Sequence, residues 1–330
     1  MTLTRVIYLS ASKILSRLGW LVVPLKNSKG FTVLFSGKAE IAGAPPDRLA
    51  RASQIATYVF GESGQIVSSR TNLRGGNHYG PHHYAMSNGT GITQKITSSP
   101  REILISKWMW HLQSSERSSN FEVAPTFWEV NEGPVGGGGE IFLETHNPCS
   151  EKDLKSDSFA VEVGRLGFAL ESFLAEAPPR ALEFPAPDPV AKVAELLSRA
   201  GVRPPQTEFL KIVSDLLRHQ PLVRCHGDLG WLNIVRHREN GSLLAIDFAD
   251  IRCFHPGAAL FNFGSARQRF KDLMLDAYIQ ESQRPALPVR LAFNLQVLIQ
   301  NLEIGISTGR KERRIARQFS QDCSVIEALI

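Results

Sequence analysis

Two short stretches carry most of the information about this chain: HGDLGWLNIV, residues 226–235, and SLLAIDFAD, residues 242–250. The first brings His226, Asp228 and Asn233 together in one short segment, and the second ends an apolar run on Asp247. One interpretation is a polar turn that Asp228 and Asn233 cap with their side chains. The other is a site for a metal ion and a nucleotide, because carboxylate and amide oxygens are the ligands that Mg²⁺ prefers.

The chemistry of phosphoryl transfer explains why these residue types would occur together. Transfer from ATP needs a carboxylate that orients the attacking hydroxyl and accepts its proton, and oxygen ligands that hold Mg²⁺ on the phosphates. The spacing of Asp228 and Asn233 lets one loop present a carboxylate and an amide to the same small volume. Asp247, at the end of a strand-like run, would deliver a second carboxylate beside them.

The pattern HGDLGWLNIV followed by AIDFAD resembles the aminoglycoside phosphotransferase/choline kinase family, which has a protein-kinase-like fold. The resemblance is specific over these two segments and weaker over residues 66–330. It implies that Asp228 is the catalytic base, that Asn233 and Asp247 bind Mg²⁺, and that His226 braces the loop. Asp250 is either a supporting group beside the metal ligands or a turn-capping residue.

The resemblance also implies nucleotide-binding residues upstream. Lys95, in the predicted strand ITQKIT, stands where the family has its phosphate-pairing lysine, and Glu102 opens the next helix, where it can position that lysine. Glu144–His146 would form the hinge that contacts adenine through backbone groups.

A glycine-rich stretch, RGGNHYGPHH at 74–83, is the candidate phosphate-covering loop. Gly75 and Gly76 allow backbone N–H groups to approach phosphate closely. The alternative is an ordinary hairpin tip, since the stretch is not a G-x-G-x-x-G motif.

Three positions depart from the family pattern. Trp231 and Leu232 stand where the family often has Pro-Gly, Ala249 stands where Gly is common, and Ala259 replaces an Asp that usually steadies the catalytic loop. Trp231 either shapes the acceptor pocket or packs under the loop. The missing Asp leaves the support of the loop unexplained, although the three functional residues Asp228, Asn233 and Asp247 are all present.

The periodicity of apolar residues predicts an α+β chain with a small β-rich N-lobe and a larger helical C-lobe, and the family resemblance implies that these lobes form a bilobal protein-kinase-like fold. The expected division is an N-terminal extension at 1–60, an N-lobe at 61–143 and a C-lobe at 144–330. Expected strands in the first half are 31–37, 65–73, 83–86, 92–97, 121–130 and 140–145, with helices at 44–61 and 98–113. Expected helices in the second half are 157–176, 190–200, 207–219, 258–280 and 289–306, with short strands within 221–255.

The N-terminus forms a basic, amphipathic segment. Residues 1–51 hold eight Lys/Arg and two Asp/Glu, a net charge of +6. The whole chain has a net charge of +5, so the remaining residues carry a net charge of −1. Apolar residues at helical spacing predict a helix over 2–24, which is too short in its apolar run to span a bilayer. It is interpreted as packing on the body of the protein, lying on an anionic membrane surface, or serving as an organellar presequence.

Composition limits the partners and the compartment. With 43% hydrophobic and 21% charged residues the chain is an ordinary globular protein. Its four scattered cysteines, without a CxxC pair, favour reduced thiols in the cytoplasm, with peripheral membrane contact through residues 1–25 left open. No nucleic-acid-binding signature accompanies the basic charge.

The sequence therefore predicts an ATP- and Mg²⁺-dependent phosphotransferase that acts on a hydroxyl of a small molecule, such as a sugar, an amino alcohol or an antibiotic. Two alternatives remain at this point. One is a kinase of a membrane- or lipid-linked saccharide, and the other is a nucleotide-binding pseudokinase that acts as a scaffold.

Overall fold

The computed structural model describes residues 20–24, 31–35, 40–42, 44, 46–72, 81–114, 123–133, 138–178, 188–202 and 208–330. The chain divides into two compact units. Unit 1 comprises Met1–Glu116 and Thr126–Thr145, and unit 2 comprises Arg117–Pro125 and His146–Ile330.

Unit 1 is built on an antiparallel sheet with the strand order β3-β4-β5-β6-β8-β7. Its strands are β3 (Glu40–Ala42), β4 (Ile66–Asn72), β5 (His82–Met86), β6 (Gly91–Thr97), β7 (Phe127–Glu132) and β8 (Gly139–Glu144). The predicted order of three strands, one helix and two strands is confirmed by β4, β5, β6, α3 (Pro100–Ser114), β7 and β8.

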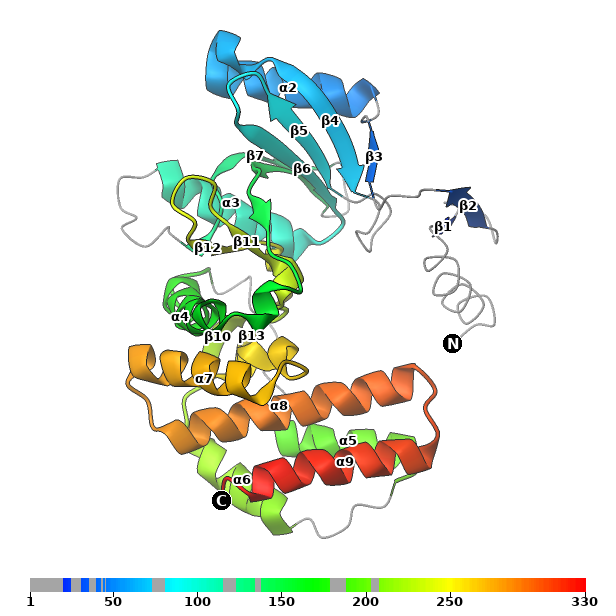
Figure 1. Ribbon diagram of the computed structural model, residues 1–330, viewed down its shortest axis with the longest axis vertical. Helices are drawn as coiled ribbons and strands as arrows, with labels where there is room; N and C mark the ends of the chain where they lie inside the picture. The colour runs from blue at the N-terminus through cyan, green and yellow to red at the C-terminus, as the bar shows by residue number, and fades with distance from the viewer. Residues whose placement is uncertain are drawn as a thin grey trace. The chain divides into compact units, whose positions relative to one another are not determined.

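One face of this sheet is covered by α2 (Pro46–Phe60), which runs alongside it in Figure 1. Pro46 and Asp47 suit a helix start, because proline lacks an N–H that the first turn would leave unpaired and a carboxylate favours the positive helix end. Ala52 and Ile55 pack with Tyr84 and Phe142 of the sheet in one buried cluster. The helix therefore belongs to the core of unit 1, although the sequence alone assigned it to an N-terminal extension.

The N-terminal segment differs from the predicted amphipathic helix. Trp20–Pro24 is the strand β1, which pairs antiparallel with β2 (Phe31–Phe35), so the helix prediction was wrong for these residues. Val22, Val23 and Pro24 explain the difference, because β-branched residues favour strands and proline ends helices. The first 19 residues lie outside the described part of the chain, as do Gly75 and Gly76.

The second helix of unit 1, α3, begins with a serine cap. Ser99 Oγ accepts a 3.2 Å hydrogen bond from the backbone N–H of Glu102. Such a cap satisfies one of the N–H groups that a helix start leaves unpaired. Glu102 is thereby fixed in the first turn of α3, where its side chain is buried.

Unit 2 is mainly helical. Its helices are α4 (Asp157–Leu174), α5 (Pro189–Ala200), α6 (Glu208–Arg218), α7 (Gln268–Ser282), α8 (Ala286–Ser307) and α9 (Glu312–Glu327). Helices α5, α8 and α9 lie side by side in Figure 1, and their apolar faces share one buried cluster with α6. The central member is α8, whose Leu291, Leu298 and Leu302 are almost completely buried.

Two helices of unit 2 differ from expectation. The helix predicted over 258–280 is interrupted, because a 3₁₀ helix at Ala258–Phe263 and the long helix α7 are separate elements. Gly264 ends the first, consistent with the poor helix propensity of glycine. Helix α9 was not predicted, although Ile315, Phe319, Cys323 and Ile326 recur at helical spacing and are buried.

Short strands carry the segments of interest in unit 2. They are β9 (Asn147–Pro148), β10 (Val223–His226), β11 (Ile234–Arg236), β12 (Leu243–Ala245) and β13 (Ile251–Phe254). Strand β10 pairs with β13, and β11 pairs with both β12 and β9, all antiparallel. No helix within the described ranges is both long and apolar enough to cross a membrane.

Candidate active site

The loop after β10 presents Asp228. His226 ends the strand opposite Ile251, and the chain then turns at Gly227, whose N–H donates to Asp250 O over 2.7 Å. A Cβ on Gly227 would lie 2.0 Å from that oxygen, so only glycine permits this approach of the two strands. The turn leaves Asp228 exposed to solvent.

His226 supports the loop through hydrogen bonds of its two ring nitrogens. Its ring is buried, with Nε2 2.8 Å from the carbonyl oxygen of Ile246 and Nδ1 3.3 Å from the backbone N of Asp228. The carbonyl can only accept, so Nε2 donates and Nδ1 accepts the Asp228 N–H, which is the neutral tautomer. Burial lowers the pKa of His226, consistent with that form. The geometry agrees with the bracing role that the family resemblance implies.

Asn233 turns its side chain toward Asp228. The Nδ2 group donates to the backbone oxygen of Asp228 over 2.7 Å and to its carboxylate Oδ2 over 3.1 Å. Because the nitrogen faces Asp228, the amide oxygen Oδ1 points away from it. That oxygen is the atom with which an asparagine binds a hard cation.

Asp247 lies next to the same hairpin end. Ile234 pairs with Ala245, and the N–H of Ile246 donates to Asn233 O over 2.9 Å, so Asn233 and Asp247 leave the β11–β12 ladder at the same end. Asp247 has φ 66° and ψ 62°, in the left-handed region. A non-glycine residue held there costs about 1–3 kcal/mol, and such strain is concentrated at functional sites. Its carboxylate is exposed.

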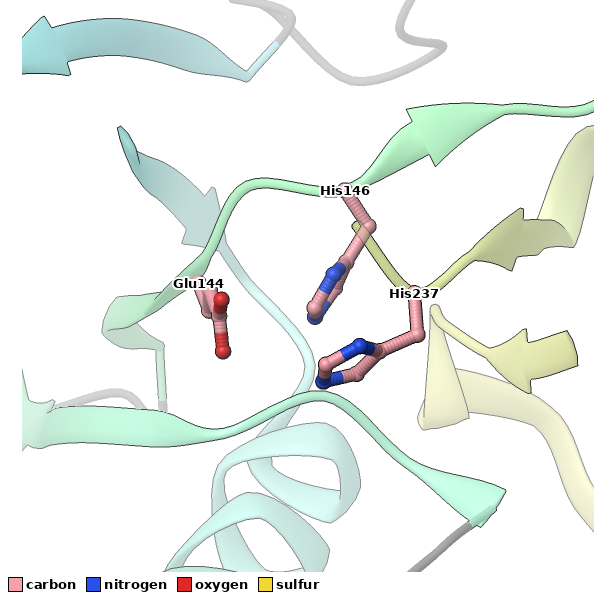
Figure 2. A group of neighbouring side chains, drawn as sticks. All are labelled: Glu144, His146 and His237. Carbon is pink, nitrogen blue, oxygen red and sulfur yellow. The ribbon is translucent and has the colours of Figure 1, made fainter. Parts of the chain in front are cut away.

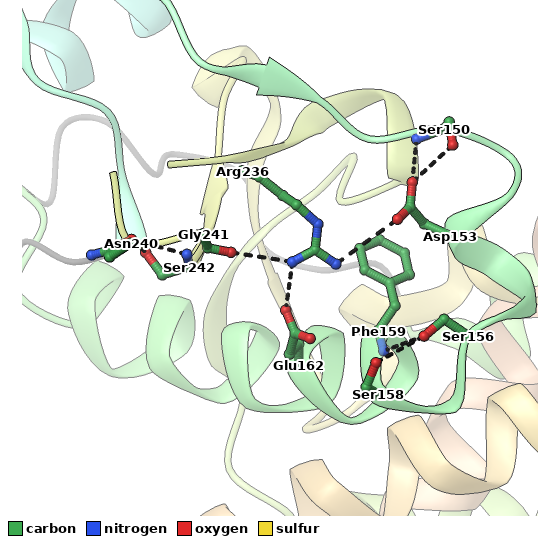
Figure 3. A network of polar contacts seen from close by, with 10 residues as sticks. All are labelled: Ser150, Asp153, Ser156, Ser158, Phe159, Glu162, Arg236, Asn240, Gly241 and Ser242. Atoms are coloured by element: carbon green, nitrogen blue, oxygen red, sulfur yellow. Dashed lines mark hydrogen bonds and ion pairs between the residues drawn. The ribbon is translucent and has the colours of Figure 1, made fainter. Parts of the chain in front are cut away.

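The hairpin that positions Asn233 and Asp247 is anchored by Arg236, shown in Figure 3. The guanidinium donates to Glu162 Oε2 over 2.9 Å and to the carbonyl oxygen of Gly241 over 3.1 Å, and it lies over the ring of Phe159. A rigid fork of donors suits such a junction better than a lysine would. The contacts join β11 to α4, so the end of the hairpin rests on a helix.

Lys95 and Glu102 form the ion pair that the family resemblance predicts. Lys95 Nζ lies 2.5 Å from Glu102 Oε1, with the lysine side chain 25% exposed and the glutamate 4%. Lys95 comes from the middle of β6 and Glu102 from the first turn of α3, both in unit 1. Their pairing is confirmed, and their contact with phosphate stays a prediction.

The predicted hinge residues lie on both sides of the boundary between the units. In unit 1, the N–H of Glu144 donates to Thr126 O over 2.8 Å, and the N–H of Thr145 donates to Gly91 O over 2.9 Å. In unit 2, His146 is buried with its ring centroid 5.0 Å from that of His237. Figure 2 shows the two rings next to each other. Burial, then His237 and Arg238, lower the pKa of His146 to about 4. Contact with adenine stays a prediction.

Two residues that the sequence did not single out complete the surroundings of Asp228. Asn262 Nδ2 donates to Asp228 Oδ1 over 2.9 Å, and Gln300 Nε2 donates to Asn262 Oδ1 over 2.7 Å. No motif connects residues so far apart in the chain. Asp250, which was left open, forms an ion pair with Arg252 at 2.7 Å.

This fold is the protein-kinase-like fold of small-molecule phosphotransferases, as predicted. Among solved structures, the chain is similar to macrolide 2'-phosphotransferase MphH from Brachybacterium faecium (TM-score 0.50, 16% identity, 82% of this chain and 97% of that chain covered). It is also similar to choline kinase from Cryptosporidium parvum Iowa II (TM-score 0.54, 13% identity, 86% and 96% covered). A third is the GDP complex of aminoglycoside 2'-phosphotransferase-IIIa (TM-score 0.50, 13% identity, 85% and 97% covered). No protein-family model and no curated protein matches the sequence.

Proposed function

We propose that this protein transfers the γ-phosphoryl group of ATP to a hydroxyl group of a small molecule. The observation that carries the proposal is the arrangement around Asp228, an exposed carboxylate with an amide donor on each of its two oxygens. A general base must be accessible and held in one orientation, and this carboxylate satisfies both conditions.

The proposed reaction begins with the acceptor hydroxyl directed at the γ-phosphorus by Asp228. As the hydroxyl oxygen forms its bond to phosphorus, the bond from phosphorus to the β–γ bridging oxygen breaks, and the hydroxyl proton passes to the Asp228 carboxylate. The products are a phosphate monoester and ADP. Phosphoryl transfer needs positioning and charge neutralisation more than covalent help from the protein.

The residues present fit a magnesium ion. Asn233 keeps its amide oxygen turned away from Asp228, and Asp247 holds an exposed carboxylate at the same hairpin end. Both are hard oxygen donors of the kind Mg²⁺ takes when it also binds substrate phosphates. When bound, the ion would neutralise the charge that develops on the phosphates.

Lys95 is the residue of unit 1 that we propose pairs with the nucleotide phosphates. Glu102 orients its ammonium group, because a buried carboxylate next to a partly exposed lysine holds that lysine in one conformation. The solved structure of aminoglycoside 2'-phosphotransferase-IIIa is a complex with GDP, so a protein of this fold binds a purine nucleotide. ATP as the nucleotide of this chain is part of the proposal.

An ADP-release screen with Mg²⁺-ATP tests the function. The purified chain would be assayed against a panel of hydroxyl-bearing small molecules, together with Asp228→Ala. We expect acceptor-dependent ADP release by the wild type and a loss of about 10²–10⁴-fold in the variant, the range typical of general base catalysis. Binding of Mg²⁺-ATP without acceptor-dependent turnover would instead favour the scaffold alternative.

A further inference from the structure

The carboxylate of Asp228 is held from two sides by groups of different origin. Asn233 belongs to the same loop, so its bond to Oδ2 is local. Asn262, which bonds to Oδ1, comes from the 3₁₀ helix Ala258–Phe263, more than thirty residues further along the chain. The second bond therefore ties the loop to a different part of unit 2.

The 3₁₀ helix that carries Asn262, called the platform below, is firmly packed. Leu260 and Phe263, on either side of it in the 3₁₀ helix, are 0% and 1% exposed. The loop approaches this platform closely, because a Cβ on Gly230 would lie 3.4 Å from Asn262 Cβ. Asn262 is thus fixed by its neighbours rather than by the loop it contacts.

Gln300 orients the Asn262 amide so that its nitrogen faces Asp228. An asparagine side chain can turn either its nitrogen or its oxygen toward a neighbour, and only the nitrogen donates to a carboxylate. Gln300 Nε2 donates to Asn262 Oδ1 over 2.7 Å, which holds that oxygen on the far side. Gln300 sits on α8 between Leu298, Ile299 and Leu302, which are buried in the helical core.

We propose that Asn262 and Gln300 form a positioning chain for Asp228, from the core of unit 2 to the loop. The chain supplies the support that is missing at position 259, where a buried alanine offers no polar group. An amide suits this role because it donates to the carboxylate without placing a second charge beside it. The catalytic consequence rests on the proposed phosphotransferase function, whereas the positioning itself does not.

Three substitutions distinguish a role of Asn262 and Gln300 in positioning Asp228 from a role in packing. Asn262→Ala removes the donor to Asp228. Gln300→Glu keeps the shape of residue 300 but replaces its donor by an acceptor, so Asn262 Oδ1 loses its donor and two carboxylates compete for the Asn262 NH₂ group. Asn301→Ala is the matched control, because Asn301 lies on α8 next to Gln300 and its amide donates over 3.0 Å to the carboxylate of Asp322 on α9, not to the loop.

The first measurement is amide hydrogen exchange over residues 227–233, which needs no activity. Several N–H groups there donate within the protein, including those of Gly227, Gly230 and Asn233. We expect faster exchange of this segment in Asn262→Ala and Gln300→Glu, and wild-type exchange in Asn301→Ala. Wild-type exchange in both site variants would overturn the inference, even if one of them were less stable overall.

The second measurement is turnover with Mg²⁺-ATP and water as the phosphoryl acceptor, which gives ADP and inorganic phosphate. We expect kcat to fall about ten- to a hundred-fold in both site variants with KM for ATP unchanged, because misplacement of a reacting group by about 1 Å can cost that much. The shorter side chain of Gln300→Asn is expected to keep kcat near the wild-type value only if its amide still reaches Asn262. Gln300→Glu does not depend on this condition and is therefore the decisive variant. Unchanged kcat in Gln300→Glu would contradict the catalytic part of the inference.

The two measurements distinguish failure of the inference from failure of the proposed function. A wild-type protein that forms no ADP with any acceptor contradicts the function, and hydrogen exchange still decides the positioning. If the wild type is active and both site variants behave like Asn301→Ala, the proposed function stands. The inference that Asn262 and Gln300 position Asp228 is then overturned.

Discussion

Lys95 and Glu102 form an ion pair with 2.5 Å between Nζ and Oε1, which joins β6 to the first turn of α3. The glutamate is 4% exposed, so its carboxylate is buried against the ammonium group of Lys95. A second lysine–glutamate pair of unit 1, Lys107 with Glu132 at 2.8 Å, has a glutamate that is 65% exposed. The two pairs differ in burial, and their effects on stability and on nucleotide binding should differ accordingly.

The first prediction concerns Lys95→Met and its control Lys107→Met. Removing Lys95 leaves a buried carboxylate unpaired, and we expect a loss of about 1–3 kcal/mol in the free energy of unfolding. Loss of the exposed pair should cost less than about 1 kcal/mol. Only Lys95→Met should also weaken Mg²⁺-ATP binding, measured by titration calorimetry. Equal nucleotide affinity in both variants would argue against phosphate pairing by Lys95.

The second prediction concerns glycines in the Asp228 loop. In Gly227→Ala the new Cβ would lie 2.0 Å from Asp250 O, and we expect a loss of about 1–3 kcal/mol in stability from the forced shift. In Gly230→Ala the nearest atom, Asn262 Cβ, lies 3.4 Å away, and φ −121° is open to any residue. Denaturant unfolding should therefore show little change for Gly230→Ala. Similar losses in both variants would contradict this description of the turn.

The third prediction concerns pH and His83. Its Nδ1 lies 3.0 Å from Thr93 Oγ1, and burial, then Arg70 and His82, lower the pKa of His83 to about 4. Below the ordinary pKa of 6.5 the unfolded chain binds a proton that the folded His83 does not. Stability should therefore fall as pH is lowered from about 6.5 to about 4.

The variant His83→Gln tests whether His83 causes this loss of stability at lower pH. Glutamine can still hydrogen-bond Thr93 but does not titrate, so its stability should fall less than that of the wild type over the same pH window. Thermal unfolding of unit 1 at several pH values between these limits provides the comparison. The same pH dependence in both proteins would contradict the assignment to His83.

The fourth prediction concerns Leu232, which stands between Asp228 and Asn233 and is 71% exposed. Leu232→Ser should change the stability by no more than about 0.5 kcal/mol, as is usual for exposed positions. We expect it to change the KM for the acceptor while the KM for ATP stays the same, because this exposed apolar side chain belongs to the loop that carries the proposed base. Leu222→Ser, at a position that is 48% exposed and outside the loop, is the control. Equal acceptor KM values in all three proteins would exclude Leu232 from acceptor recognition.

The sequence predicted the parts of the site that follow one another closely in the chain. The spacing of His226, Asp228 and Asn233 is local. In the structure His226 Nδ1 accepts from the backbone N–H of Asp228, and Asn233 Nδ2 donates to the Asp228 carboxylate. Glu102 follows from the family resemblance, because it stands only seven residues after Lys95 at the start of the next helix. Motifs of this kind are visible because the chemistry and the backbone turn depend on neighbouring residues.

Support from distant residues could not be predicted in the same way. Asn262 and Gln300 reach Asp228 only because the 3₁₀ helix and α8 pack in a particular arrangement, which no local pattern specifies. The strand at Trp20–Pro24 was missed because its apolar residues also fit a helical period. The sequence did not predict helix α9, because its apolar stripe, which includes Ile315 and Phe319, is narrow and lies among many polar and charged residues.

The most direct test of the central claim follows the phosphoryl group itself. ATP labelled on its γ-phosphate would be incubated with Mg²⁺, the protein and an acceptor found by ADP release, and the label would be traced. We predict that the wild type places the label in a phosphate monoester of the acceptor and that Asp228→Asn does so about 10²–10⁴-fold more slowly. Label that stays in ATP or appears only as inorganic phosphate, or equal transfer by Asp228→Asn, would contradict the account.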